Sequence, residues 1–173
     1  MPTIRLRTEV KAGKALVFDL SRSIDLHKLS TAHTHETAIA GKTSGLIGLN
    51  EWVTWRAKHF GIYQQLTSEI TAYERPNFFV DEMVSGAFKS FRHEHHFEDL
   101  NGESDIHRTL MLDTFTYRTP LGLLGRLADA LFLERYMTEL LEKRNAVVKD
   151  YAESEQWKAV LPVVPETEVT GSK

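Results

Sequence analysis

Three ionisable side chains in the second half of the chain carry the clearest chemical signal. His93 and His95 stand two residues apart in a segment that alternates like a β-strand, so both lie on one face with Phe91. Asp113 lies in the next predicted strand. The Asn-Gly pair at 101–102 is a strong hairpin signal. Pairing of the two strands through this turn can bring the carboxylate close to the histidines.

An imidazole beside a carboxylate supports two interpretations. Together with His59 and Asp81, these residues can form a polar cluster inside an apolar cavity. Such a cluster would orient the carbonyl or hydroxyl group of a ligand, or exchange protons near neutral pH. Alternatively, the histidines only satisfy a buried aspartate, which needs a hydrogen-bond partner. The sequence leaves both interpretations open.

The same residue types raise the question of a metal site. A His-x-His spacing occurs twice on predicted strands, at 33–35 and 93–95, and Asp81 or Asp113 would complete a three-ligand set. Two-residue spacing within a strand is common by chance, so we expect neither a metal nor another cofactor. The chain has no cysteine, no Gly-x-Ser-x-Gly motif and no dinucleotide fingerprint. Thiolate metal sites and a cysteine nucleophile are therefore excluded.

Aromatic side chains crowd the strand region and would supply the apolar part of a cavity. Most of them are expected in the core. The five that we expect to face a ligand are Trp55, Phe79, Phe91, Phe115 and Tyr117. The polar members of the predicted ligand-binding set are His59, Asp81, His93, His95 and Asp113. No residue is predicted to be catalytic.

A sheet must position these residues, and the patterns along the chain predict one. Residues 3–10 alternate apolar and polar side chains, as in a half-buried strand, and two short helices follow within 15–29. Six further strands are predicted at 33–40, 51–60, 62–73, 78–84, 88–100 and 105–117. Because short turns join these strands, the sheet should be antiparallel.

A long amphipathic helix is predicted after the last strand. Apolar residues recur three and four apart from Leu124 to Leu141. We expect the helix to run from Pro120 to at least Asn145, with Trp157 as its outer limit. Only the sheet is large enough to cover its apolar face. A curved sheet around one helix leaves space between the two layers, where an apolar ligand can bind.

Short motifs accompany these elements in a fixed order. They are Val53-Thr54-Trp55-Arg56-Ala57, His59-Phe60-Gly61, Phe79-Val80-Asp81-Glu82, Gly86-Ala87-Phe88, His93-Glu94-His95-His96-Phe97, Asp113, Tyr117-Arg118-Thr119-Pro120-Leu121-Gly122 and Gly125-Arg126-Leu127. With these motifs, residues 2–145 resemble the START-like superfamily, in its polyketide cyclase/dehydrase-like SRPBCC branch.

The resemblance implies an α+β helix-grip fold. In this fold a seven-stranded curved antiparallel sheet wraps around a long C-terminal helix, and two short helices follow the first strand. The resemblance also implies a cavity between sheet and helix that holds a hydrophobic or amphipathic small molecule. The resemblance implies no catalytic residue, because the members of the branch that are most similar to this chain are uncharacterised and share no catalytic signature.

Composition and charge narrow the function classes. The 173 residues fit one domain, and a net charge of -3 gives no sign of nucleic-acid binding. No apolar run approaches the ~20 residues of a membrane helix. We expect a ligand-binding domain over 1–157 and a mobile tail over 158–173, which is rich in Glu, Thr and Val. Because the chain lacks cysteine, we expect a cytoplasmic location.

Binding of a hydrophobic or amphipathic small molecule is the function that these observations favour. A lipid, an isoprenoid or a polyketide-like aromatic would fit, and the protein would then act in transport or sensing. Two alternatives stay open. One is an enzyme of cyclase, dehydratase or hydrolase type, with a His/Asp pair of the cavity as acid and base. The other is a module for protein interaction or self-association.

Overall fold

One antiparallel sheet dominates the structure, a computed structural model that describes residues 2–100, 107–119 and 132–161. Within these residues, seven strands are arranged in the order β1-β7-β6-β5-β4-β3-β2. The strands are β1 (Thr3–Val10), β2 (Thr37–Gly41), β3 (Trp52–His59), β4 (Ile62–Glu74), β5 (Phe78–Ser85), β6 (Ser90–Asp99) and β7 (Thr109–Arg118). The predicted seven-stranded antiparallel sheet is confirmed.

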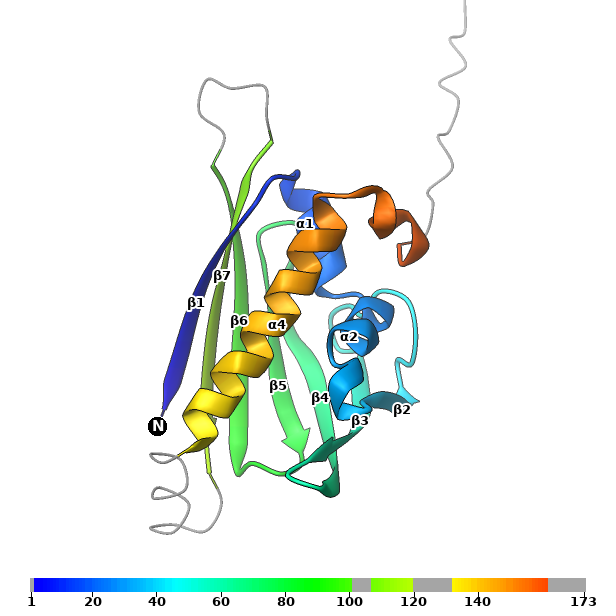
Figure 1. Cartoon of the computed structure of the whole chain (residues 1–173), viewed down its shortest axis with the longest axis vertical. Coiled ribbons are helices and arrows are strands. Elements are labelled where there is room, and N and C mark those ends of the chain that lie inside the picture. Colours follow the sequence, from blue (N-terminus) through cyan, green and yellow to red (C-terminus); the bar gives the residue numbers. More distant parts are fainter. Residues whose placement is uncertain (1, 101–106, 120–131, 162–173) are drawn as a thin grey trace, which may run out of the picture.

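Helices cover one face of this sheet. The long helix α4 (Glu134–Ala152) crosses that face, and α1 (Lys14–Ser21) and α2 (Ile24–Ser30) pack against it (Figure 1). Two short 3-10 helices, η1 (Ala32–Thr34) and η3 (Glu155–Ala159), complete the described elements. Helix α4 ends between the two limits predicted for it. Residues 120–131, the first part of the predicted helix, lie outside the described residues.

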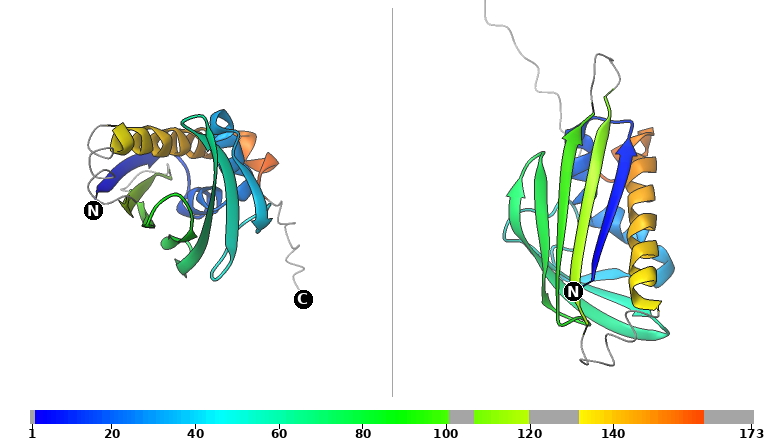
Figure 2. Two further views of the ribbon diagram at one scale, coloured as in Figure 1. Left: turned by 90° about the horizontal axis from the view of Figure 1, so that it is seen from below. Right: turned by 90° about the vertical axis from the view of Figure 1, so that its left-hand side faces the viewer.

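The sheet curves around α4 (Figure 2). The register between β4 and β5 shifts twice, once beside Ser68 and once between Ile70 and Ala72, as at β-bulges. A bulge bends the strand that carries it and increases the local twist. These two irregularities lie in the middle of the sheet, so they contribute to a concave face that can grip the helix. The α+β helix-grip architecture expected from the sequence is confirmed.

Strands β6 and β7 bring the predicted chemical residues together. Burial alternates along β6, where Phe91, His93 and His95 face inward. The antiparallel register places His93 opposite Phe115 and His95 opposite Asp113. Directly opposite side chains lie about 4.5–5.5 Å apart at their β-carbons. The strand alternation therefore predicted the correct faces, and the register decides which residues meet.

The interior has two unlike halves. In one half Phe18 of α1 is fully buried and packs edge-on against Tyr73, Phe79 and Phe97, with ring centroids 5.3–5.5 Å apart. This aromatic cluster fills the space between the sheet and the C-terminal part of α4. In the other half, a smaller cluster that includes Leu141 packs under the N-terminal part of the helix. The cavity described below lies in that second half.

The strand predicted at 33–40 begins only at Thr37, because His33 lies in η1 and His35 adopts a left-handed conformation with φ 52°. The His-x-His spacing at 33–35 is therefore not on a strand, and that part of the metal hypothesis is wrong.

Among the described helices none is long and apolar enough to cross a membrane.

The C-terminal segment is described as far as residue 161. After η3, Val160 and Leu161 are partly buried and pack against the main core cluster. These contacts belong to the first residues of the predicted tail. Residues 162–173 lie outside the described residues, so the mobile tail stays a prediction. The hairpin predicted at 101–102 also lies outside them.

Candidate functional site

A cavity of about 450 Å³ lies between the concave face of the sheet and α4. This volume is in the range of small-molecule sites in proteins. Its wall is mostly apolar, with Trp55, Ala57, Leu66, Phe88, Phe91, Phe115, Met137 and Leu141. The polar residues of its wall include His27, Glu36, His59, Ser68, Asp81, His93 and Tyr136.

A smaller pocket of about 100 Å³ adjoins the cavity at its inner end. Both spaces share the polar residues His27, Ser68, Asp81 and His93 and the apolar residues Trp55, Leu140 and Leu141, which together form the partition between them. Beyond the partition the small pocket is lined by His95 and Arg144. A group of polar residues therefore stands at the inner end of the chamber, whereas other polar residues, including His59 and Tyr136, line its wall elsewhere.

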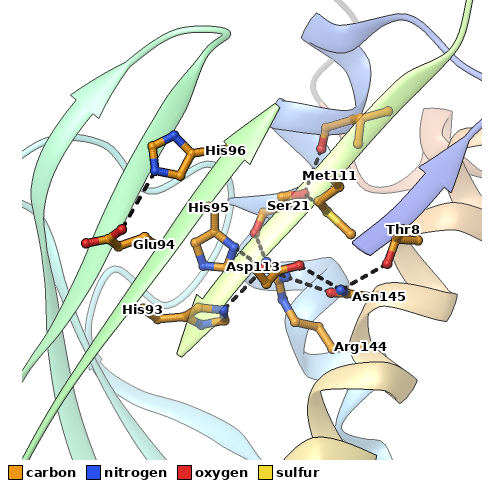
Figure 3. A network of polar contacts seen from close by, with 11 residues as sticks. Thr8, Ser21, His93, Glu94, His95, His96, Met111, Asp113, Arg144 and Asn145 are labelled. Atoms are coloured by element: carbon orange, nitrogen blue, oxygen red, sulfur yellow. Dashed lines mark hydrogen bonds and ion pairs between the residues drawn. The ribbon is translucent and has the colours of Figure 1, made fainter. Parts of the chain in front are cut away.

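A carboxylate holds the residues behind this inner end in place. Asp113 is 2% exposed, and Nε2 of His93 lies 3.2 Å from its Oδ1. Nδ1 of His95 comes within 2.6 Å of the same oxygen but is poorly aligned for a hydrogen bond. Asn145 donates from Nδ2 to Oδ2 at 2.7 Å. These contacts join β6, β7 and α4 in one network (Figure 3).

The positive charge of this network comes from α4. Nη1 of Arg144 lies 3.6 Å from Oδ1 of Asp113 and donates to Oδ1 of Asn145 at 3.1 Å. Nη2 donates to the backbone carbonyl of Ser21 at 2.7 Å. The guanidinium is buried, so its charge depends on these partners rather than on water. The network thus ties α4 to α1 as well as to the sheet.

Burial and neighbouring groups set the charges. Burial by itself would raise the pKa of Asp113, but His93 and His95 hold that pKa well below its usual range. Burial lowers the pKa of His95 well below its usual value, so this imidazole is neutral at neutral pH. Burial also lowers the pKa of Arg144, which remains a cation because guanidinium does not lose its proton in proteins. Asp113 and Arg144 therefore form one buried ion pair.

Asp81 differs from Asp113 although both lie on the inward face of the sheet, on the two strands β5 and β7 that flank β6. Asp81 is opposite His93 in the β5–β6 register. In the described part of the chain its buried Oδ1 has no hydrogen-bond partner. Burial raises the pKa of Asp81, and the hydrogen bond with Ser68 and the electrostatic effect of the nearby His93 imidazole offset this only in part. The carboxyl group is thus biased toward its neutral, protonated form.

Aromatic contacts and one hydrogen bond form the opposite, outer end of the cavity. His59 Nδ1 lies 2.7 Å from the Tyr136 hydroxyl oxygen, which joins β3 to α4. The Phe60 ring contacts Tyr136 and Phe132, with centroids 4.7 and 5.7 Å apart. Phe60 is nevertheless 58% exposed. This end, which we call the mouth, is therefore held by rings that are partly open to solvent.

The predicted ligand-binding residues fall into three groups. Six of them line the larger cavity: Trp55, His59, Asp81, Phe91, His93 and Phe115. Phe79 and His95 line the small inner pocket. Asp113 and Tyr117 line neither space. Asp113 lies behind the imidazoles, and Tyr117 is fully buried against Phe88 and Phe115.

The prediction missed the contribution of α4 to the polar end. Arg144 and Asn145 follow Leu141 by three and four residues and precede Val148 by four and three. Leu141 and Val148 are buried, so the same spacing places the two polar residues on the inward face. The spacing from Leu141 and Val148 could have revealed this position. It was overlooked because charged and amide side chains on a helix usually face solvent.

The second His-x-His pair of the metal hypothesis, His93 and His95, does lie close to Asp113. Each of the three residues offers one ligand atom, and these atoms lie within 4.8 Å of one another. The Arg144 guanidinium, however, already contacts the same carboxylate oxygen. A metal ion at this position would meet that positive charge at close range in a buried site. The arrangement fits a hydrogen-bonded ion pair better than a metal centre.

The chemistry available at the inner end follows from these positions. His93 is oriented by a buried carboxylate on one side and faces the cavity on the other. Asp81, its cross-strand neighbour, is biased toward the protonated form. A base next to an acid has the parts needed for proton transfer. The same two groups can also serve as a hydrogen-bonding site for a ligand that does not react.

Comparison with known proteins rests on structure. No family model matches the chain, and no curated protein matches its sequence. The protein TTHA0849 from Thermus thermophilus superposes with a TM-score of 0.63 at 18% identity, over 87% of this chain and 99% of that chain. Major latex-like protein 151 from Panax ginseng gives a TM-score of 0.63 at 13% identity, over 88% and 98% of the two chains.

A third solved structure carries a superfamily name. A START superfamily protein from Mycobacterium smegmatis gives a TM-score of 0.63 at 10% identity, over 87% of this chain and 97% of that chain. At such low identities the likeness concerns the fold alone. It agrees with the strand order, the curved sheet and the long terminal helix described above. The chain therefore has the helix-grip fold of the START/SRPBCC proteins.

Proposed function

We propose that this protein binds a hydrophobic or amphipathic small molecule in the cavity between the sheet and α4. The observation that carries the proposal is the cavity itself, about 450 Å³ of space with a mostly apolar wall and a group of polar residues at its inner end. A packed protein interior contains few voids larger than a water molecule. A cavity of this size is therefore unusual for a packed core, and it is large enough for a small molecule.

The lining supports an apolar ligand with one polar end. Rings and aliphatic side chains such as Trp55, Phe115 and Leu141 would bury the body of the ligand. Burial of apolar surface contributes about 25 cal/mol per Å², before the losses of ordering are subtracted. A lipid, an isoprenoid or a polyketide-like aromatic would satisfy this description. Carriage or sensing of the ligand would follow from reversible binding.

Binding can be tested directly. The protein should take up N-phenyl-1-naphthylamine, a neutral apolar probe that fluoresces in apolar surroundings, with a 1:1 stoichiometry. Ala57 is 3% exposed and lines the cavity, so Ala57→Leu places extra atoms in that space. We expect this variant to bind the probe at least about tenfold more weakly, which corresponds to about 1.4 kcal/mol.

The matched control is the same substitution on the solvent side of α4. Ala146 is exposed and lines neither pocket. Ala146→Leu should leave the affinity for the probe unchanged. Equal affinities for the wild type and both variants would show that the probe binds elsewhere, and absence of binding to the wild type would argue against the proposal.

The enzyme alternative can be examined on the same samples. Native mass spectrometry and solvent extraction would identify a ligand that purifies with the protein. Under the binding proposal this molecule is recovered unchanged after incubation with fresh protein. Conversion by the wild type, and no conversion by His93→Gln, would favour the enzyme instead.

A further inference from the structure

The polar side chains of the partition show which chemical group the inner end fits. Ser68, Asp81 and His93 line both the larger cavity and the small inner pocket, as does His27, whose Nε2 lies 3.3 Å from a carboxylate oxygen of Glu36. The neighbouring walls of the cavity, including Trp55 and Phe115, are aromatic. A polar group of a ligand that reaches this end must therefore pair with the partition, because an unpaired polar group against apolar walls costs free energy.

His93 can accept a hydrogen bond from such a group. Its Nε2 faces the Asp113 carboxylate, which only accepts, so Nε2 must carry the proton. In a neutral imidazole the other nitrogen, Nδ1, is then an acceptor. Within the described ranges, none of the hydrogen bonds of His93 uses Nδ1. Asp113 thus fixes both the tautomer and the direction of the ring.

Asp81 supplies the complementary donor. Its Oδ1 is buried and finds no partner among the described residues. A lone buried carboxylate is unfavourable, whereas a protonated carboxyl group offers one O–H donor. Burial, which raises the pKa of Asp81, acts in the same direction. The β5–β6 register places this donor directly across from His93.

The charge of the surroundings selects against an anionic group. Arg144 is the buried cation of the inner pocket, and the Asp113 carboxylate already compensates it. A carboxylate on a ligand would add a second negative charge without adding a cation. It would also leave Nδ1 of His93 unpaired, because a carboxylate cannot donate. A hydroxyl group both donates and accepts, so it satisfies His93 and Asp81 together.

We infer that the inner end of the cavity recognises a neutral hydroxyl group, so that the ligand is an apolar alcohol or phenol rather than an organic acid. This inference rests on the proposed function, because it assumes that the cavity holds a ligand. It assigns Asp81 as the donor to the hydroxyl oxygen and His93 as the acceptor of the hydroxyl proton. The remaining body of the ligand lies against the aromatic walls.

Three probes that share one ring system test this inference on the wild-type protein: 2-naphthol, 2-methoxynaphthalene and 2-naphthoate. Their dissociation constants would be measured at pH 7 by calorimetry or fluorescence. We expect 2-naphthol to bind roughly fivefold to tenfold more tightly than the ether, the gain typical of one well-made hydrogen bond. It should also bind more tightly than the naphthoate anion.

Two variants of Asp81 separate a donor from a charge. Asp81→Asn keeps a neutral donor, so the preference for 2-naphthol over the ether should persist within about threefold. Asp81→Leu is similar in size but has no donor, so the preference should disappear while the ether still binds. Binding of the ether also reports that the cavity of each variant is intact.

Each unfavourable result has a distinct meaning. If the wild type binds the ether as tightly as 2-naphthol, or binds 2-naphthoate most tightly, the hydroxyl inference is overturned while the proposed binding function stands. If the wild type binds none of the three probes and does not bind N-phenyl-1-naphthylamine, the proposed function itself fails, and the inference fails with it.

Discussion

The two ends of the cavity are built on different physical principles. At the inner end, Asp113 of β7 and Arg144 of α4 form a buried ion pair. This ion pair holds the two neighbouring imidazoles of β6 in place. At the mouth, His59 and Tyr136 share one hydrogen bond, and exposed rings such as Phe60 make the remaining contacts. Water can replace a lost contact at the mouth but not at the inner end.

This contrast indicates that the two ends of the cavity have different roles. Charges out of water are stable only with their partners, so the inner end has one permitted arrangement and can present fixed donors and acceptors to a ligand. Contacts between partly exposed rings are worth less and can break one at a time. Loss of one contact at the mouth should therefore cost little, whereas the inner end cannot rearrange without a large loss of stability. The following changes test this difference.

The largest effect is expected from the loss of the buried cation. Arg144→Met keeps a long side chain but leaves Asp113 charged and without its positive partner. Removal of one partner of a buried ion pair typically costs 3–5 kcal/mol, so we expect a loss of about that size in the free energy of unfolding. Urea denaturation followed by circular dichroism would measure it.

The adjacent residue provides the control for that experiment. Lys143 is exposed on the same helix turn, so Lys143→Met should change the free energy of unfolding by less than about 0.5 kcal/mol. A loss below about 1 kcal/mol for Arg144→Met would mean that water or another group replaces the guanidinium. The contrast between the two ends would then disappear.

An intermediate effect is expected in the pH dependence of stability. Burial lowers the pKa of His95, so near pH 6.5 the unfolded chain takes up a proton that the folded chain does not. The unfolded state is therefore favoured as pH falls, and this histidine alone should cost about 2 kcal/mol between pH 7 and pH 5. His95→Gln should remove that part of the decrease.

The surroundings of His95 contain other groups that affect the curve. The pKa of Asp81 is raised, so its contribution has the opposite sign, and the stabilisation from Asp113 is lost only as the pH falls through its lowered pKa. Both groups remain in the variant, so the difference between the two curves reports His95. The control is His96→Gln at an exposed position of the same strand, which should change the free energy of unfolding at pH 7 by less than about 0.5 kcal/mol. Parallel curves for wild type and His95→Gln would contradict the prediction.

The smallest effect is expected at the mouth. Tyr136→Phe removes the hydroxyl that bonds His59 and leaves the ring in place, so we expect a loss of about 0.5–1.5 kcal/mol or less. Thermal or urea unfolding would measure it. Tyr151→Phe on the same helix is the control, because its hydroxyl makes no hydrogen bond to the described residues. A loss as large as that of Arg144→Met would show that the mouth is as constrained as the inner end.

Local patterns predicted most of the architecture. The alternation in β6 and β7 put His93, His95 and Asp113 on the inward face, and the structure confirms this. The start of β2 was wrong, because a 3-10 turn that follows α2 ends with a hydrogen bond from the His35 amide to Ala32. Such a short turn depends on how the preceding helix ends, and its sequence carries no periodic signal.

The site residues on strands were predicted from the sequence, whereas those on α4 were not. Side chains on strands could be assigned to a face because the period of two allows only two directions. Arg144 could not be assigned with the same rules, because a charged residue on a helix normally faces water. Its burial depends on Asp113, which is 31 residues earlier in the chain, and on the carbonyl of Ser21.

Local sequence patterns were enough to predict the order of the elements, the inward faces of β6 and β7 and the chemical types available inside. These properties follow from local geometry and from the hydrophobic effect, which act over a few residues. The tertiary structure was needed to show that Asp113 supports the cavity from behind, that Oδ1 of Asp81 has no hydrogen-bond partner among the described residues and that Arg144 is buried. The physical reason is that charge and hydrogen bonding depend on neighbours in space, which the strand register and the docking of α4 determine.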